Sequence, residues 1–255
     1  MMHYTKMHGI GNDYLFVFGE VPQNAAELSR KYSDRKNGIG SDGMIYINYS
    51  DIADFSMRIF NADGSEAKMC GNGIRCVARF VREKGYTDKD ELTVETLSGV
   101  KRLRMDGEYV TVDMGKAEIS DDVMLDLGFE CTPVSVGNPH AVIFTDDVAL
   151  ILLRDIGPKI ECNKAFPGRV NAEFVQVMGE RELRMRVWER GSGETQACGT
   201  GACASAAASV KKGFCRAGEP ITVHLDGGDL EITVKDDLTC LMKGPAEFVC
   251  DGEIL

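Results

Sequence analysis

The sequence predicts an α+β protein of two pseudo-symmetric domains, each a mostly antiparallel sheet wrapped around a central helix. Two observations support this fold class. Residues 57–78 and 185–206 resemble each other without a gap at an offset of 128 residues. In each copy, apolar residues alternate as in strands and are followed by an apolar segment with helical spacing. We therefore expect domains at 1–116 and 117–245, with residues 246–255 free to return to the first.

The internal repeat rests on identities spread along the chain. Within the two segments, the identical pairs are Met57/Met185, Arg58/Arg186, Glu66/Glu194, Cys70/Cys198, Gly71/Gly199, Gly73/Gly201 and Ala78/Ala206. A second similarity pairs Gly11-Asn12 with Gly137-Asn138, and a third pairs Gly115-x-Ala117 with Gly244-x-Ala246, all at nearly equal offsets. A repeat of about 127 residues is far longer than the 20–50 residues of a solenoid unit. Two similar domains are therefore indicated.

Period-two alternation predicts strands in both copies. The segments are 54–60, 101–105 and 109–114 in the first copy, and 182–188, 222–225 and 230–234 in the second. Asp-Gly-Glu at 106–108 and Asp-Gly-Gly-Asp at 226–229 are turn signals between neighbouring strands. These strand–turn–strand units favour antiparallel pairing.

Two helices are expected directly after the repeated cysteines. Residues 74–84 carry apolar side chains on one face and end at Gly85, a typical C-cap. Residues 202–212 are almost all small, and a helix that is apolar all round is a buried one. A third, short helix through Tyr32 is expected to open on a capping box at residues 24–27.

Composition excludes several classes of protein. The chain has 255 residues, 44% of them hydrophobic and 27% charged, which are ordinary values for globular proteins. Its net charge of −11 argues against nucleic acid as a partner, because phosphate binding needs a basic surface. The N-terminus has no signal-peptide pattern, and no apolar run approaches the roughly 20 residues that cross a bilayer. We therefore expect a cytoplasmic protein without a membrane partner.

Nine cysteines and four histidines are present. A disulfide framework is not expected in a reducing cytosol. The absence of any CxxC spacing argues against a zinc knuckle and a thioredoxin-type motif, and no HxxxH pattern appears, so we expect no metal. Most of the cysteines are expected to be small core residues. Cys70 and Cys198 are the exceptions, because they occupy equivalent positions in the repeat.

Cys70-Gly-Asn-Gly and Cys198-Gly-Thr-Gly each stand where a predicted strand meets a predicted helix. A helix N-terminus presents unpaired N–H groups and about half a positive charge. We therefore expect each thiol pKa to fall from about 8.5 toward neutrality, and the following amides to bind a carboxylate. If both helix ends face one ligand, one sulfur lies on each side of it. The predicted active site is then in the cleft between the two domains.

A thiol on each side of one carbon suits a two-base racemase. That reaction needs a base on one face of the carbon and an acid on the other, both tuned near the working pH. It also needs donors that meet the charge developing on the carboxylate. Either motif alone would more often be a buried cysteine before a helix. The catalytic interpretation is favoured because two copies lie at equivalent positions.

Five segments resemble the signatures of the diaminopimelate epimerase family: GIGNDY, FNADGSEAKMCGNG, GNPH, RVNAEF and ERGSGETQACGTG. The resemblance runs from about residue 7 to residue 205, and the repeat extends it to the end of the chain. Such proteins are cofactor-independent, two-cysteine amino-acid epimerases. The resemblance implies an isomerase that interconverts LL- and meso-2,6-diaminopimelate for lysine and peptidoglycan precursor synthesis. It further implies no pyridoxal phosphate or other cofactor, and a homodimer.

The resemblance also assigns site residues by position. Cys70 and Cys198 would be the catalytic thiols, and His140 and Glu189 would tune them. The substrate-binding residues would be Asn12, Asn61, Gly71, Asn72, Asn138, Asn171, Glu189, Arg190, Gly199 and Thr200. Among these, the residues after each cysteine would cradle the reacting carboxylate, and the four asparagines at 12, 61, 138 and 171 would hold the distal end. One departure is Gly43, where many members have Gln, so this position offers only backbone.

Plainer explanations exist for some of these residues. His140 precedes an apolar run and would by itself suggest a structural histidine. Asn61 begins a good turn sequence, and Glu189-Arg190 would make a surface ion pair of little value. At the level of function, the alternatives are another pyridoxal-independent racemase of the same fold, a thiol redox protein, or a non-catalytic amino-acid-binding protein.

Overall fold

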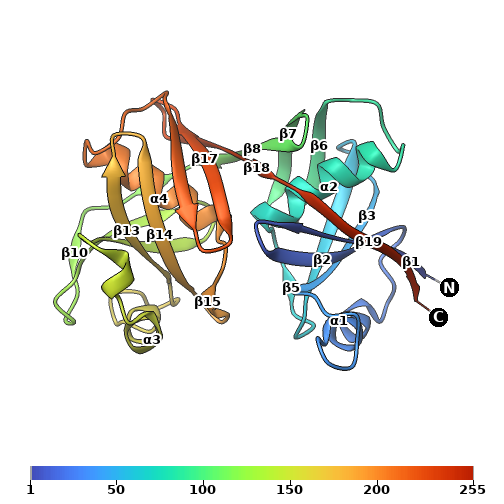
Figure 1. Cartoon of the computed structure of the whole chain (residues 1–255), viewed down its shortest axis with the longest axis horizontal. Coiled ribbons are helices and arrows are strands. Elements are labelled where there is room, and N and C mark those ends of the chain that lie inside the picture. Colours follow the sequence, from blue (N-terminus) through green and yellow to red (C-terminus); the bar gives the residue numbers. More distant parts are fainter. Residues whose placement is uncertain (1, 255) are drawn as a thin grey trace. The chain divides into compact units, whose positions relative to one another are not determined.

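The computed structural model describes residues 2–254 (Figure 1). The chain forms two compact units: unit 1 comprises the residues up to Val112 and those from Gly244 onward, and unit 2 is Asp113–Lys243. The division expected from the repeat places residues 113–116 in the first domain and residues 244–245 in the second. The structure places residues 113–116 in unit 2 and residues 244–245 in unit 1. The domain boundaries expected from the repeat stay a prediction.

Unit 1 contains a curved sheet and two helices. Its strands are β1 (Met2–Gly9), β2 (Asn12–Phe18), β3 (Gly43–Tyr49), β4 (Phe55–Asn61), β5 (Glu66–Ala67), β6 (Glu91–Thr96), β7 (Gly99–Asp106), β8 (Tyr109–Lys116) and β19 (Glu247–Ile254). Its helices are α1 (Ala25–Ser33) and α2 (Gly71–Glu83). The strand order is β19-β1-β2-β3-β4-β6-β7-β8, and only the pairs β2/β3 and β4/β6 are parallel.

Unit 2 repeats this plan. Its strands are β9 (Glu118–Ile119), β10 (Val123–Met124), β11 (Glu130–Ser135), β12 (Pro139–Phe144), β13 (Asn171–Gly179), β14 (Glu182–Glu189), β15 (Gly193–Thr195), β16 (Pro220–Leu225), β17 (Gly228–Val234) and β18 (Thr239–Pro245). Its helices are the 3-10 turn η1 (Val148–Leu150), α3 (Leu153–Glu161) and α4 (Gly199–Lys211). The order β9-β11-β12-β13-β14-β16-β17-β18 has parallel pairs only at β12/β13 and β14/β16.

The two sheets have the same sequence of parallel and antiparallel neighbours, which confirms the pseudo-symmetric α+β fold. Each sheet curls around its long helix. In unit 1, α2 packs on the neighbouring strands β1 and β2 and also on β7, which is distant from them in the strand order; in unit 2, α4 packs on strands from β11 to β17 (Figure 1). Both helices are buried along most of their length. Helix α4 is small or apolar at nearly every position, and a helix of that kind is stable only when it is buried all round.

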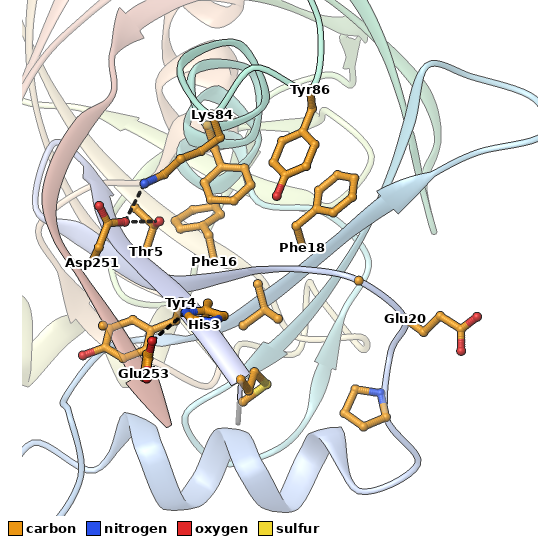
Figure 2. Close-up of a pocket in the computed structure, with 16 residues that line it drawn as sticks. His3, Tyr4, Thr5, Phe16, Phe18, Glu20, Lys84, Tyr86, Asp251 and Glu253 are labelled. Atoms are coloured by element: carbon orange, nitrogen blue, oxygen red, sulfur yellow. Dashed lines mark hydrogen bonds and ion pairs between the residues drawn. The ribbon is translucent and has the colours of Figure 1, made fainter. Parts of the chain in front are cut away.

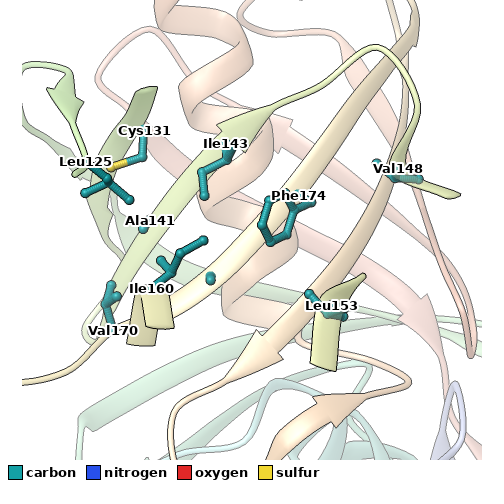
Figure 3. Close-up of a cluster of buried hydrophobic side chains, with 10 residues drawn as sticks. Leu125, Cys131, Ala141, Ile143, Val148, Leu153, Ile160, Val170 and Phe174 are labelled. Carbon is teal, nitrogen blue, oxygen red and sulfur yellow. The ribbon is translucent and has the colours of Figure 1, made fainter. Parts of the chain in front are cut away.

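A shorter helix covers the other face of each sheet. In unit 2, α3 packs on β13 and β14, and its Leu153 and Ile160 join a buried cluster with Ile143 and Phe174 (Figure 3). In unit 1, α1 packs on β3 and β4, in the region of a cluster that includes Met44. Burying each such side chain contributes about 1.5–3 kcal/mol, so both faces of each sheet help to fix the strand ends that carry the site.

Several local expectations need adjustment. Both central helices begin three residues earlier than expected, so the cysteines themselves are the N-cap residues. The capping box at residues 24–27 is wrong: Asn24 precedes α1 but its side chain makes no cap hydrogen bond. Helix α3 is not among the helices expected from the sequence, because Gly157 and Pro158 disfavour a helix interior, although Leu153, Ile156 and Ile160 keep a helical spacing. Within residues 2–254, no helix is both long and apolar enough to span a bilayer.

Candidate active site

Cys70 is the N-cap of α2. Its backbone is extended (φ −137°, ψ 118°), and its sulfur accepts the Gly73 N–H at 3.4 Å. The thiol donates to the amide oxygen of Asn12 at 3.3 Å. A Cβ on Gly73 would lie 2.6 Å from Cδ1 of Ile45, so the glycine lets the helix pack here without moving that side chain. The thiol is thus held between a backbone donor and a side-chain acceptor, and it is only half-buried.

Two predicted asparagines meet at this thiol. The Asn72 amide donates to the same Asn12 oxygen at 3.3 Å, and its own oxygen accepts from Arg75 at 3.0 Å. Arg75 is completely buried inside α2 and also reaches the Pro245 carbonyl at 3.1 Å. Asn12 donates to the carboxylate of Asp42 at 2.6 Å. These contacts fix both amides against Cys70.

Tyr14, two residues along β2 from Asn12, also contacts this thiol. It is almost fully buried, and its hydroxyl hydrogen-bonds with Cys70. Burial, then the negative charge of a Cys70 thiolate, raises the Tyr14 pKa well above its usual value. Tyr14 therefore remains a protonated donor. Together, Asn12, Tyr14, Cys70 and Asn72 form what we call the Cys70 cluster.

Asn61 is engaged elsewhere. It ends β4 opposite Gly43, and its amide donates to the Ser65 hydroxyl at 3.0 Å within the turn that follows. This contact favours a role for the Asn61 side chain in the turn. Gly43 offers no side chain, and a Cβ there would lie 2.3 Å from the Phe60 carbonyl.

Cys198 is the N-cap of α4 and is buried. Its backbone is extended (φ −125°, ψ 103°), and its sulfur lies 3.6 Å from the Thr200 hydroxyl. It also hydrogen-bonds with Glu189, the last residue of β14. Burial, then the charges of Glu189 and Glu173, raises the Cys198 pKa well above the ordinary cysteine value. The expected fall toward neutrality is wrong for this thiol, because burial and two carboxylates outweigh the helix end.

His140 lies beside Cys198 through a short chain of contacts. Its Nδ1 is 2.6 Å from Glu173 Oε1, and its Nε2 is 3.0 Å from Asn138 Oδ1. The Asn138 amide in turn donates to the Thr200 hydroxyl at 3.3 Å. The parallel pairing of β12 with β13 places His140 opposite Asn171 and brings Glu173 to the same region. We call His140, Glu173, Glu189, Cys198, Asn138 and Thr200 the Cys198 cluster.

Glu189 has an unusual environment for a carboxylate. Burial raises its pKa, and hydrogen bonds from Thr195 and Cys198 oppose that rise. It follows directly after Trp188 and is followed by the turn at Gly191, whose φ is +83°. The Glu189 side chain is therefore held at the end of β14 against Cys198. The surface-ion-pair explanation would require it to pair with its neighbour Arg190 instead.

Arg190 is exposed, and its guanidinium donates to the Gly168 carbonyl at 3.1 Å. Its backbone N–H donates to the Asn171 oxygen at 2.8 Å. Glu161, at the end of α3, holds both sides of this segment: it accepts from the Trp188 indole at 2.7 Å and from the Gly191 N–H at 2.8 Å. The buried carboxylate is also paired with Arg169.

Sequence reasoning misses Tyr14, Glu161 and Glu173. A signal exists for Glu173, because an ionisable residue inside the buried run 171–175 is exceptional in a parallel strand. Glu161 and Tyr14 offer no comparable signal, since their partners are distant in the chain. Gly71 and Gly199 are the first residues of α2 and α4, where their amides are available at the helix ends.

A separate pocket of about 740 Å³ lies in unit 1, between β1, β2, β19 and the end of α2 (Figure 2). Lys84 and Thr5 both contact Asp251 at one side of it, and Phe18 stacks on Tyr86 at the other. None of the predicted site residues lines this pocket. Among the described residues, no group of three or more His, Cys, Asp and Glu side chains is arranged to hold a metal ion.

Comparison with known proteins identifies the family. The sequence model described as diaminopimelate epimerase matches residues 4–120 and 132–249, one stretch in each half of the chain. The chain belongs to the diaminopimelate epimerase family. Relatives named diaminopimelate epimerase include one from Bacteroides thetaiotaomicron, 51% identical over 98% of this chain and 97% of its own length. Another family member, from Methanococcus maripaludis, is 48% identical over 99% of both chains.

Solved structures share the fold. A phenazine biosynthesis protein of the PhzF family from Bacillus anthracis superposes with a TM-score of 0.80 at 17% identity, over 100% of this chain and 99% of its own. A probable proline racemase from Agrobacterium radiobacter gives a TM-score of 0.74 at 14% identity, over 100% of this chain and 93% of its own. The epimerase fold therefore extends well beyond recognisable sequence similarity.

Proposed function

We propose that this protein is a diaminopimelate epimerase that interconverts LL- and meso-2,6-diaminopimelate by moving a proton at one α carbon. Membership of the family supports the substrate and the reaction. The observation that carries the mechanism is the repeat of one arrangement: each unit places a cysteine at the N-cap of its central helix.

Cys70 and Cys198 are proposed to act on opposite faces of the same carbon. One thiolate removes the α proton, so the C–H bond breaks and its electron pair passes into the adjacent carboxylate. The other thiol delivers its own proton to the opposite face, which inverts the carbon and leaves a thiolate. Reaction in the other direction exchanges the roles. No electron leaves the substrate, so no oxidant or reductant is needed.

The helix N-termini are proposed to stabilise the developing anion. The amides that follow the two cysteines, at Gly71, Asn72, Gly199 and Thr200, belong to the first turn of a helix, where N–H groups point out of the helix end. Such donors, already oriented before reaction, meet the charge on the substrate carboxylate without reorganisation. This role makes pyridoxal phosphate and metal ions unnecessary, and we propose that neither is required.

His140 and Glu189 are proposed to adjust the proton affinity of Cys198. Glu189 hydrogen-bonds with the thiol and, by its charge, raises the thiol pKa. This keeps Cys198 a thiol, and so a proton donor, in the free protein. The wider setting is proposed from the family: a homodimer in the cytoplasm that supplies lysine and peptidoglycan precursors.

The distal amino-acid end of the substrate is proposed to bind Asn12, Asn61, Asn138, Asn171 and Arg190. Arg190 can offer a planar fork to a carboxylate. The chain around Arg190 is fixed by two sets of hydrogen bonds. The Arg190 N–H donates to Asn171, and Glu161 accepts from Trp188 and Gly191 on either side.

The deciding experiment is incubation with LL-diaminopimelate in heavy water. We expect meso isomer to form together with one deuterium at the inverted carbon, without added metal or pyridoxal phosphate. Isomer formation without label would reject the two-base scheme. Label in proline or simple amino acids, but not in diaminopimelate, would instead indicate another racemase of this fold. No label in any amino acid would favour a redox or binding protein.

A further inference from the structure

Glu173 is a buried ionisable residue that the proposed mechanism does not use. Its side chain is 0% exposed, and so is that of its partner His140. One carboxylate oxygen lies 2.6 Å from His140 Nδ1, while the other, Oε2, has no hydrogen-bond partner among the described residues. A buried carboxylate without a compensating charge is costly. The His140 ring is the ionisable group in direct contact with it.

The contacts of His140 determine how many protons its ring carries. A neutral imidazole has one donor and one acceptor nitrogen, whereas an imidazolium has two donors. Nδ1 faces the Glu173 oxygen at 2.6 Å, and Nε2 faces the Asn138 oxygen at 3.0 Å. In the structure, the Asn138 amide nitrogen faces the Thr200 hydroxyl and the Asn138 oxygen faces the His140 ring. Both ring nitrogens therefore face oxygen acceptors, which an imidazolium satisfies and a neutral ring does not.

One other group approaches the ring. The Asn171 amide nitrogen lies 3.4 Å from Nδ1, with its orientation fixed because its oxygen accepts the Arg190 N–H. This contact is longer and weaker than the one to Glu173, so the carboxylate is the partner of the Nδ1 proton. The charged or titratable groups around the ring are then Glu173 on β13, Glu189 on β14 and Cys198 at the start of α4.

Glu173 and the Cys198 thiol both lie next to Gly201. A Cβ added to Gly201 would lie 2.8 Å from Glu173 Oε1 and 3.2 Å from Cys198 Sγ. Because Gly201 has no side chain, the first turn of α4 can approach the Glu173 carboxylate. The charge state of the Glu173–His140 pair is therefore felt at the thiol at short range, in a buried region where screening is weak.

We propose that Glu173 is a positioning residue that keeps His140 as an imidazolium, and that this cation stabilises Cys198 when it becomes a thiolate. The inference rests on the proposed function, since it names the source of the charge that balances that thiolate. Without the cation, a Cys198 thiolate would face the carboxylates of Glu189 and Glu173 alone. Glu173 acts through His140 and does not touch the substrate.

The direct test is the charge of His140, read by ring nitrogen NMR of the wild-type protein without substrate. Only four histidines are present, so the His140→Gln spectrum assigns the signal. We expect both ring nitrogens of His140 to carry a proton, because each of them faces an oxygen acceptor. In Glu173→Gln the same ring should become neutral. A neutral His140 in the wild type, or an imidazolium retained in Glu173→Gln, would overturn the proposal.

The matched control is Glu161→Gln. Glu161 is a second buried carboxylate in unit 2, but it contacts Trp188, Gly191 and Arg169 rather than His140. Its replacement should leave the His140 signal charged. Loss of the charge in this control would mean that any disturbance of unit 2 neutralises the ring, and would refute a specific role for Glu173.

Thermal unfolding provides a second readout that does not depend on activity. His140→Gln should leave Glu173 as an uncompensated buried charge, whereas the double variant His140→Gln/Glu173→Gln removes that charge. We expect the double variant to melt at a higher temperature than His140→Gln. The opposite order would contradict a charge pair. Because neither measurement uses diaminopimelate, their outcome is distinguishable from failure of the proposed reaction.

The kinetic consequence is specific. Glu173→Gln should lower kcat by about tenfold or more, a smaller loss than the roughly 10²–10⁴-fold that an acid–base group itself contributes, with little change in KM. Glu173→Asp, which keeps the charge, should recover part of the loss. An equal fall for the Asp and Gln variants would point to packing instead and would count against the proposal.

Discussion

The thiol of Cys70 donates to the amide oxygen of Asn12 at 3.3 Å, whereas the corresponding asparagine of the repeat, Asn138, is directed to other partners. The Asn138 oxygen faces His140 and its amide nitrogen faces Thr200. After burial, the charges that raise the pKa of Cys198 are those of two carboxylates, Glu189 and Glu173. The internal symmetry of the fold is therefore broken at the two sulfurs, and we expect the two thiols to differ in reactivity.

The first prediction concerns the catalytic thiols. Cys70→Ala and Cys198→Ala should each lower epimerisation by at least about 10²–10⁴-fold, because each thiol serves one face and neither replaces the other. Cys162→Ser, at an exposed position, is the control and should keep normal turnover. The measurement is meso-diaminopimelate formation under reducing conditions. More than a tenth of wild-type turnover in either alanine variant would contradict the two-base scheme.

The second prediction is a pH dependence. The raised pKa of Cys198 means that it is a neutral thiol at neutral pH and becomes a thiolate only as the pH rises toward that value. Its alkylation by iodoacetamide should therefore be slow at pH 7 and increase about tenfold per pH unit. Peptide mass spectrometry measures each cysteine separately. A rate that is already at its plateau at pH 7 would show that the thiol is ionised there.

Glu189→Gln tests the cause of that shift. Removing the carboxylate charge should lower the Cys198 pKa, so alkylation at a fixed pH should become faster while turnover falls. Burial, the largest cause, stays in place, so the shift should be reduced rather than abolished. Slower alkylation in this variant would show that Glu189 does not oppose the thiolate.

A third prediction follows from the Tyr14 hydroxyl. A hydrogen bond to a charged group contributes about 1.5–3 kcal/mol, so Tyr14→Phe should disfavour the Cys70 thiolate by roughly tenfold or more. Alkylation of Cys70 should slow accordingly, with the fold unchanged. Tyr46→Phe is the matched control, because that buried hydroxyl lies 3.9 Å from the Met44 sulfur and not beside Cys70. Equal effects in both variants would assign the loss to packing.

The sequence alone predicts the features that are local or repeated. Alternating strands, the helices after Cys70 and Cys198, and the repeat are enough to predict two similar lobes. The contacts that adjust the site are not predictable in this way. Glu173 meets His140 only because β12 and β13 pair in parallel, and Tyr14 meets Cys70 only because α2 packs on β2. The sequence-based expectation for the Cys198 pKa is wrong for the same reason, since burial and the charges of other strands are not visible in the residues beside the cysteine.

A fourth prediction uses Trp188, the single tryptophan in the chain. Its indole donates to Glu161, so Glu161→Gln should weaken the bond and shift the intrinsic fluorescence, which reports on this tryptophan alone. The turn at Gly191 should loosen at the same time, because its N–H donates to the same carboxylate. Since Arg190 lies between them, KM should rise more than kcat falls. A changed kcat with unchanged KM and fluorescence would contradict a role in holding this segment.

The last prediction concerns specificity at the distal end of the substrate. Arg190 is exposed, its backbone is fixed by Asn171, and its guanidinium donates to a carbonyl rather than a carboxylate, so it can take a carboxylate partner. A site built for such a group rejects an analogue that lacks it by up to about 10⁴–10⁵-fold, because its own polar groups are left unpaired. L-Lysine lacks only the distal carboxylate and should be a very poor substrate. Arg190→Lys should raise KM for diaminopimelate strongly, because a point charge does not replace the planar fork. Turnover of L-lysine within tenfold of the diaminopimelate rate would show that the distal carboxylate is not recognised, and would assign the protein to a broader amino-acid racemase.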